Sequence, residues 1–207
     1  MLGPTAFPRL PLIFSLRYAT DGDTAARWLM GIDQQDPFED VEQVVDLGAG
    51  NGVLGIGALL LGAQRATFVE LDGLVCEVLE EALEAEGLGA RARVLQEDVQ
   101  ELQGLGVEPE LVLMNPPWGQ QRRSADRPFL EASVRMAQRC VHLMHSAQAV
   151  HLEPWAAEQG WEAARWLEVD FPLPKRYAHQ QKRRAFTRAA MWRLERSERE
   201  RKRIEES

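Results

Sequence analysis

The sequence predicts an α/β fold in which a mostly parallel sheet ends in an antiparallel hairpin. Three observations carry this prediction. Short apolar strands alternate with helical segments along most of the chain, which is typical of a parallel sheet with crossover helices. The first strong strand runs into a glycine-rich turn and then a helix. Near the C-terminus, two strand-like segments flank a basic loop, which favours a hairpin.

Local signals place each element in order. A capping Asp23 or Thr24 favours a first helix, Pro128 favours a helix start, and Gly62 favours a helix end. The strands expected are 41–47, 66–69, 92–96, 111–114, 140–145, 166–173 and 185–194. The helices expected are 23–30, 53–62, 74–86, 128–138 and 154–159.

The length of 207 residues suits one domain with a full core. We expect this domain over 1–195 and a charged, frayed helical tail from about 195 to the end, taken as 196–207. Cys76 and Cys140 lie far apart without a Cys-x-x-Cys pattern, which indicates core residues rather than a metal site or a disulfide. No apolar run approaches the length of a membrane span and the N-terminus lacks a signal-peptide pattern, so we expect a cytoplasmic protein.

The charge is unevenly distributed. A net charge of −8 by itself argues against a nucleic-acid partner. However, residues 175–207 hold 12 of the 24 Lys and Arg residues and only 5 of the 32 acidic residues, a local charge of +7. The basic end, which includes the loop 174–184, therefore allows contact with RNA despite the acidic body. The alternative for this loop is a solvated charged surface.

The glycine-rich turn follows the strand at 41–47 in the segment DLGAGNG. Gly48, Gly50 and Gly52 permit positive φ and let a ligand come close to the backbone, as in nucleotide-binding strand–turn–helix units. Their spacing is G-x-G-x-G, not the G-x-G-x-x-G of dinucleotide-binding proteins. The alternative is a purely structural turn.

Acidic residues follow the next two strands. Glu70 ends the second strand, where an acid can hold the hydroxyls of a ribose. Asp72 better fits the alternative role of an acid at a helix N-terminus. Asp98 follows the third strand, where it could accept a hydrogen bond from an adenine amino group or be only a solvated loop acid.

The bend after the fourth strand combines Asn115, Pro116, Pro117 and Trp118. Two prolines can neither extend a helix nor donate to a sheet, so the chain is fixed in an extended bend at the strand's carboxyl end. The Asn115 side-chain oxygen and the Pro116 carbonyl could accept the two N–H groups of a planar base amine, while Trp118 stacks on the ring. The alternative is a Pro-Pro turn beside a core tryptophan.

The ordered set of motifs resembles the class I S-adenosylmethionine-dependent methyltransferases, in the branch whose Asn-Pro-Pro-aromatic bend serves amide or base-amine nitrogens. From DLGAGNGVLGIGALLLGA through NPPWG and DRPFL to LPKRYAHQQKRR, the sequence looks like the methyltransferase-like protein five family over roughly residues 12–195. The resemblance implies a Rossmann-like seven-stranded mostly parallel sheet with a C-terminal antiparallel hairpin and helices on both faces. It also implies S-adenosyl-L-methionine as cofactor and N6-methylation of adenine in small-subunit ribosomal RNA.

The resemblance assigns roles to matching residues. The methionine part of the cofactor would pass Asp46 and the glycines, Glu70 would hold the ribose where the family usually has Asp, and Asp98 with the Val99 backbone would bind the adenine. Tyr18 and Thr20 match part of a family segment that closes over the cofactor, whereas Leu16 and Arg17 depart from it. The cofactor-binding residues implied are Tyr18, Thr20, Asp46, Gly48, Gly50, Gly52, Glu70, Asp98, Val99 and Asn115.

The resemblance also extends to the target and the partner. Trp118 stands where the family has Phe. The catalytic residues implied are Asn115, Pro116, Pro117 and Trp118, and the RNA-binding residues expected are Arg122, Arg123, Tyr177, His179, Lys182 and Arg183. A small zinc-binding activator subunit, pairing edge-to-edge as a heterodimer, is the protein partner that the family suggests. We expect no metal in the chain itself, and we assign no chemistry to His142, His145 and His151.

Two other functions compete. A methyltransferase acting on the N5 of a protein glutamine, such as that of a release factor, would use the same Asn-Pro-Pro bend on a side-chain amide. The acidic body suits a protein partner, whereas the basic end argues against it. A scaffold without catalysis would keep the fold alone, but the intact turn and bend argue against that.

Overall fold

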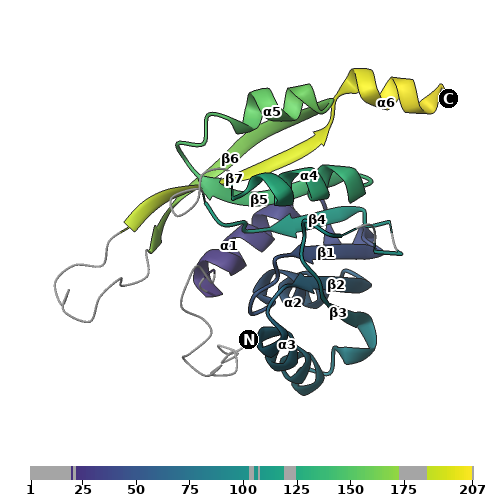
Figure 1. The fold of residues 1–207 in the computed structure, drawn as a ribbon, viewed down its shortest axis with the longest axis vertical. Coiled ribbons are helices and arrows are strands. Elements are labelled where there is room, and N and C mark those ends of the chain that lie inside the picture. The colour runs from purple at the N-terminus through teal and green to yellow at the C-terminus, as the bar shows by residue number, and fades with distance from the viewer. Residues whose placement is uncertain are drawn as a thin grey trace.

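The computed structural model describes residues 20, 22–102, 105–106, 108–118, 125–172 and 186–206. They form one seven-stranded sheet covered by helices on both faces (Figure 1). The strands are β1 (Gln43–Leu47), β2 (Arg65–Glu70), β3 (Ala92–Gln96), β4 (Leu111–Met114), β5 (Cys140–Ser146), β6 (Trp161–Pro172) and β7 (Phe186–Arg196). The helices are α1 (Gly22–Asp33), α2 (Val53–Leu60), α3 (Gly73–Ala85), α4 (Arg127–Met136), α5 (Leu152–Glu158) and α6 (Glu198–Glu205), with 3-10 turns η1 (Phe38–Asp40) and η2 (Gly89–Arg91).

The strand order is β3-β2-β1-β4-β5-β7-β6. Strands β1 to β5 pair in parallel, and β7 runs antiparallel to both β5 and β6. The predicted α/β class, the mostly parallel sheet and the C-terminal antiparallel hairpin are therefore confirmed. The order reverses between β1 and β4, and this switch point is where open α/β sheets bind ligands, beyond the carboxyl ends of the strands.

Alternating side chains of each strand build two cores. Val44 of β1 belongs to a cluster with residues of α1, α2 and α3, whereas its neighbour Val45 belongs to a cluster with residues of α4 and α5. Leu113 and Met114 of β4 divide in the same way. Successive residues of a strand point to opposite faces, so a run of apolar residues such as LVLM needs helices on both sides.

The C-terminal hairpin is longer than the sequence predicts. We expected its first strand to begin at Trp166, but β6 begins at Trp161 and pairs with β7 from the Trp161–Arg196 pair to the Pro172–Phe186 pair. Residues 161–165 contain little apolar alternation, so they carry no strand pattern. Pairing with the long β7 nevertheless fixes them, and the Arg196 guanidinium lies 4.9 Å from the centre of the buried Trp161 ring.

The charged tail forms α6. Ser197 caps it by accepting a hydrogen bond from the Glu200 backbone N–H at 3.3 Å, and Lys202 pairs with Glu198 one turn away at 2.6 Å. Among the described residues, no helix has the length and apolar character needed to cross a membrane.

Candidate active site

The glycine turn joins β1 to α2 at the switch point of the sheet. Gly48, Gly50 and Gly52 all have positive φ, at 76°, 53° and 72°. A Cβ on Gly48 would lie 2.7 Å from the Phe129 ring, and one on Gly52 would collide with Leu79, so these two glycines also allow close packing. A Cβ on Gly50 would meet nothing within 4 Å. Gly50 is therefore the position where the backbone faces open space.

Asp46 supports the turn from beneath. Its side chain is 1% exposed, and its Oδ2 accepts a hydrogen bond of 2.9 Å from the Gly55 backbone N–H in the first turns of α2. Burial raises the pKa of Asp46 to about 7, the Gly55 hydrogen bond opposes this rise, and the charge of Glu70 adds to it. A positive charge placed near this carboxyl would favour its ionised form.

Glu70 connects the end of β2 to the same turn. Its Oε2 accepts a hydrogen bond from the Gly50 N–H at 2.9 Å, and its Oε1 accepts from the N–H groups of Leu71 and Asp72 at 2.9 and 3.0 Å. Asp72 is the N-cap of α3 and accepts a hydrogen bond from the Leu74 N–H. Asp72 thus caps the helix, as expected, whereas Glu70 contacts the glycine turn.

Asp98 and Val99 follow β3 at the same edge. The backbone N–H of Glu97 donates to the Glu70 carbonyl at 3.0 Å, which holds the ends of β2 and β3 together. The Asp98 Oδ1 accepts from the Gln100 N–H at 2.9 Å, so its carboxylate shapes its own turn, while Val99 is buried. Carboxylates of Glu70 and Asp98 therefore follow two neighbouring strands.

The proline bend lies beside the glycine turn because β4 pairs with β1, with Leu113 opposite Asp46. Asn115 is half-buried, Pro116 is buried and Pro117 is exposed. The Asn115 side-chain amide donates from Nδ2 to the Thr20 Oγ1 at 3.1 Å. The structure thereby brings together Thr20, from ahead of α1, and the bend after β4.

Trp118 does not present its ring for stacking, as the sequence had led us to expect. The side chain is 8% exposed, and its ring packs against Phe171 at 5.2 Å and His145 at 6.2 Å between centroids. The indole Nε1–H donates to the Asn115 Oδ1 at 3.1 Å. An apolar ring next to a polar amide gains by packing inward while its single N–H finds an acceptor, and a tryptophan can do both at once. Trp118 therefore orients Asn115 in this structure.

A histidine–aspartate cluster adjoins the bend, with Asp126 and His145 buried and His151 exposed, and sequence reasoning missed it. The Asp126 Oδ2 accepts hydrogen bonds from the Nε2 atoms of His145 and His151, at 3.1 and 2.8 Å. Burial alone would raise the pKa of Asp126, but the hydrogen bonds from the two histidines outweigh it and lower that pKa to about 2. A histidine near the carboxyl end of a strand next to the bend was the one available signal.

A second buried cluster lies at the opposite end of β5. Asp36 is 2% exposed and pairs with Arg139 at 2.9 Å, Arg193 at 2.7 Å and His142 at 2.9 Å. The pKa of Asp36 is raised by burial but lowered far more by His142 and Arg193, and it ends well below its usual range. Burial raises the pKa of the neighbouring Cys140, which stays a thiol. Two arginines on one carboxylate make this cluster an ion network rather than a cation site.

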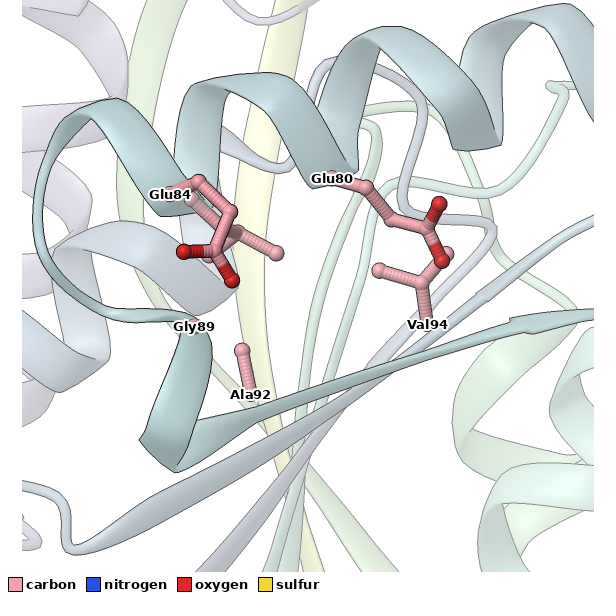
Figure 2. A pocket seen from close by; sticks show the side chains of 6 residues that line it. Glu80, Glu84, Gly89, Ala92 and Val94 are labelled. Atoms are coloured by element: carbon pink, nitrogen blue, oxygen red, sulfur yellow. The ribbon is translucent and has the colours of Figure 1, made fainter.

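A shallow hollow between α3 and β3 lies away from these groups (Figure 2). Ala92 begins β3, so the hollow lies toward the amino ends of the parallel strands. Figure 2 shows the carboxylates of Glu80 and Glu84 hanging from the helix toward the strand. Two negative charges and a position far from the switch point make it a poor candidate for the active site.

Several predicted site residues lie outside the described residues. They are Tyr18, Arg122, Arg123, Tyr177, His179, Lys182 and Arg183. Those that are described gather at one edge of the sheet, at the carboxyl ends of β1, β2, β3 and β4.

Comparison with known proteins gives the family. The family model Conserved hypothetical protein 95 matches residues 32–157. The rRNA N(6)-adenosine-methyltransferase Mettl5 of Drosophila melanogaster is 30% identical over 191 residues, which cover 89% of this chain and 88% of that protein. The chain belongs to the methyltransferase-like protein five family.

Other proteins are similar over most of the chain. The rRNA N(6)-adenosine-methyltransferase METTL5 of Danio rerio is 28% identical over 178 residues, 84% of each chain. The crystal structure of PH1948 from Pyrococcus horikoshii, provisionally named an RNA methyltransferase, superposes with a TM-score of 0.76 at 31% identity and covers 92% of this chain and 90% of that one. This methyltransferase-like protein is thus a class I enzyme that uses S-adenosylmethionine.

The described residues fit this cofactor on two observations. The glycine turn is open at Gly50, where an added Cβ would meet no protein atom within 4 Å, so a ligand has room to approach the backbone. The carboxylates of Glu70 and Asp98 follow neighbouring strands at the same edge, in the order that suits a ribose and then an adenine. The buried Asp46 adds a group that favours a nearby positive charge.

Proposed function

We propose that this enzyme methylates the N6 amino group of an adenine in RNA, and more specifically in small-subunit ribosomal RNA. The observation that carries the proposal is the Asn115 side chain, fixed at the switch point directly beside the open glycine turn. The names of the Drosophila and zebrafish relatives support adenine in rRNA as the target. The basic residues near the C-terminus support an RNA partner. We place the reaction in the cytoplasm, where ribosomes work.

When bound, S-adenosylmethionine supplies a methyl group that its sulfonium already activates. The protein's task is therefore alignment rather than activation. Glu70 would hold the ribose of the cofactor, Asp98 and the Val99 backbone its adenine, and Thr20 lies close enough to Asn115 to help close the site. Asp46, buried beneath the turn, would favour the cofactor's positive charge.

The target amine would be held by two acceptors, the Asn115 Oδ1 and the Pro116 carbonyl. A carbonyl oxygen can accept two hydrogen bonds, so the bond from the Trp118 indole is compatible with a second bond from the substrate. With both N–H groups bound by acceptors, the nitrogen lone pair would remain free to attack the methyl group. A paired adenine must first leave its stack, at a cost of a few kcal/mol. Arg122, Arg123, Tyr177, His179, Lys182 and Arg183 would hold the RNA.

Methyl transfer to RNA and Asn115→Ala together test this function. We expect tritium from labelled S-adenosylmethionine to enter small-subunit rRNA, and Asn115→Ala to lower the rate roughly 100- to 1,000-fold, as when one preorganised catalytic hydrogen bond is lost. The dissociation constant of S-adenosylmethionine should change less than about twofold. Transfer at the wild-type rate by Asn115→Ala would contradict the role of this side chain.

A release factor offered in the same assay tests the competing protein substrate. Label in its glutamine, with none in RNA, would replace adenine methylation by N5-methylation of a protein amide.

Asn115→Asp is the matched control for Asn115→Ala, because it keeps an acceptor for the Trp118 indole and so isolates the effect of losing the side chain. Thermal unfolding of both variants checks that each is folded.

A small zinc-binding activator subunit is the partner that we propose beside RNA. Strand β3 lies at one end of the sheet, and among the described residues it pairs only with β2, so its outer edge can accept another strand. We expect an equimolar complex in size-exclusion chromatography and faster methylation in its presence. Two separate peaks at micromolar concentrations would argue against the partnership.

A further inference from the structure

His145 lies beside the proline bend on the neighbouring strand. Met114 of β4 pairs with Leu143 of β5. His145 follows Leu143 by two residues and the bend follows Met114, so His145 lies level with the bend. His145 is 4% exposed, and its ring stacks on the Trp118 ring with an angle of 24° between their planes. His145 is therefore in contact with the residue that orients Asn115.

The tautomer of the neutral His145 ring is set by its two neighbours. The backbone N–H of Ser146 donates to the His145 Nδ1 at 2.8 Å, so Nδ1 carries no proton. The proton of the neutral ring is then on Nε2, which donates to the Asp126 Oδ2 at 3.1 Å. With a donor on one side and an acceptor on the other, the ring has one tautomer and one orientation.

These bonds argue against a metal ion among Asp126, His145 and His151, although their ligand atoms lie within 4.8 Å of one another. A metal on the His145 Nε2 would move the ring proton to Nδ1, since a ligating histidine normally donates from its other nitrogen. That proton would face the N–H of Ser146, and two donors would oppose each other. The cluster is therefore built to hold a ring in place.

The contacts continue to the proposed catalytic amide. Asp126, ahead of α4, holds His145, and the His145 ring lies against Trp118. The indole N–H of Trp118 then holds the Asn115 Oδ1, while Thr20 accepts from the other end of the amide. Since oxygen and nitrogen of an amide are nearly equal in shape, only such polar partners decide which of them faces the substrate.

We propose that Asp126 and His145 are positioning residues for the methyl transfer, which act through Trp118 to present the Asn115 carbonyl oxygen to the target amine. This inference rests on the proposed function of Asn115. It goes further because it makes the rate depend on two residues that do not touch the substrate. It also assigns a purpose to the tryptophan at this position, whose indole N–H a phenylalanine lacks.

The test compares His145→Gln with His142→Gln. Both histidines are buried on β5 and hydrogen-bonded to an aspartate, but His142 faces Asp36 at the far end of the strand. We expect His145→Gln to lower kcat for methylation of small-subunit rRNA roughly 10- to 100-fold, as for a misplacement of about 1 Å. The dissociation constants of S-adenosylmethionine and RNA should stay within about twofold, and His142→Gln should retain the wild-type kcat. Asp126→Asn is the second variant, and it tests the same Asp126–His145 contact if His145→Gln does not fold.

A second measurement does not depend on activity. The Trp118 indole N–H gives a nitrogen–proton NMR signal, identified by its loss in Trp118→Phe. In His145→Gln and Asp126→Asn we expect this signal to shift and its hydrogen exchange to accelerate at least tenfold, with no change in His142→Gln.

The two measurements separate the possible failures. An unmoved indole signal in the His145 and Asp126 variants overturns the proposal, as does a wild-type kcat in a variant whose signal has moved. A similar loss of kcat in His142→Gln also overturns it, because the effect would then be general destabilisation. If the wild-type enzyme methylates no RNA, the proposed function fails, and the indole signal still decides whether Asp126 and His145 hold Trp118.

Discussion

Replacing Gly50 by alanine separates the backbone strain of the turn from the space that the cofactor needs. Gly50 has a φ of 53°, and an added Cβ would meet no atom of the protein within 4 Å. The cost to folding is therefore only that of an L-residue in the left-handed region, about 1–2 kcal/mol. For a protein of this size, we expect the Tm to fall by about 2–8 °C. The hydrogen bond from the residue-50 N–H to Glu70 can persist.

The effect on the cofactor should be larger. The new methyl group would lie where S-adenosylmethionine approaches the turn, so we expect its affinity to fall at least tenfold, or about 1.4 kcal/mol. Isothermal titration calorimetry measures this loss, and differential scanning calorimetry measures the Tm. Gly52→Ala is not a clean test, because its Cβ would collide with Leu79 in the core.

Gly87→Ala is the matched control. Gly87 follows α3, has a φ of 70°, and likewise has nothing within 4 Å of an added Cβ. It should lose the same stability and keep the wild-type affinity for S-adenosylmethionine. Wild-type affinity in Gly50→Ala would refute the placement of the cofactor at this turn, and an equal loss in Gly87→Ala would assign the effect to stability.

Two further predictions concern buried carboxylates. Asp36→Ala leaves two arginines without their buried partner. We therefore expect it to lower the free energy of unfolding, measured in urea titrations, by about 3–5 kcal/mol. The control Asp40→Ala, at an exposed position, should change the free energy of unfolding by less than about 0.5 kcal/mol. Because the folded pKa of Asp36 is lowered, its contribution is complete above about pH 4 and is lost progressively as the pH falls from there toward the much lower folded pKa. Asp46 has a raised folded pKa of about 7, so its contribution is largest below about pH 4 and falls as the pH rises to 7, by up to about 1.4 kcal/mol per pH unit. Without cofactor, the stability of the wild type relative to Asp46→Asn should therefore decline from pH 4 to 7.

Each of these has a clear contrary outcome. Equal stabilities of Asp36→Ala and Asp40→Ala at pH 7 would show that the ion network contributes nothing, and a difference that grows as the pH falls from 7 to 3 would contradict the sign. Parallel stability curves for the wild type and Asp46→Asn between pH 4 and 8 would mean that Asp46 titrates alike in the folded and unfolded chain.

The elements with strong local patterns could be predicted from the sequence. The strand LVLM and its proline bend stand where expected, since four apolar residues before two prolines allow little else. The start of β6 was wrong by five residues, because residues 161–165 become a strand only by pairing with β7. Trp118 was expected at a ligand face and is buried, since its environment comes from Phe171 and His145 of other strands.

The sequence by itself determined the alternation of strands and helices, the glycine turn and the bend, because each follows from the backbone preferences of neighbouring residues. Tertiary structure alone decided which way the Asn115 amide faces and which histidine lies against Trp118. Thr20 and Asn115 meet across 95 positions, and Asp36 and Arg193 across 157. Such contacts depend on how sheet and helices pack, and a hydrogen bond between distant side chains leaves no pattern in the local sequence.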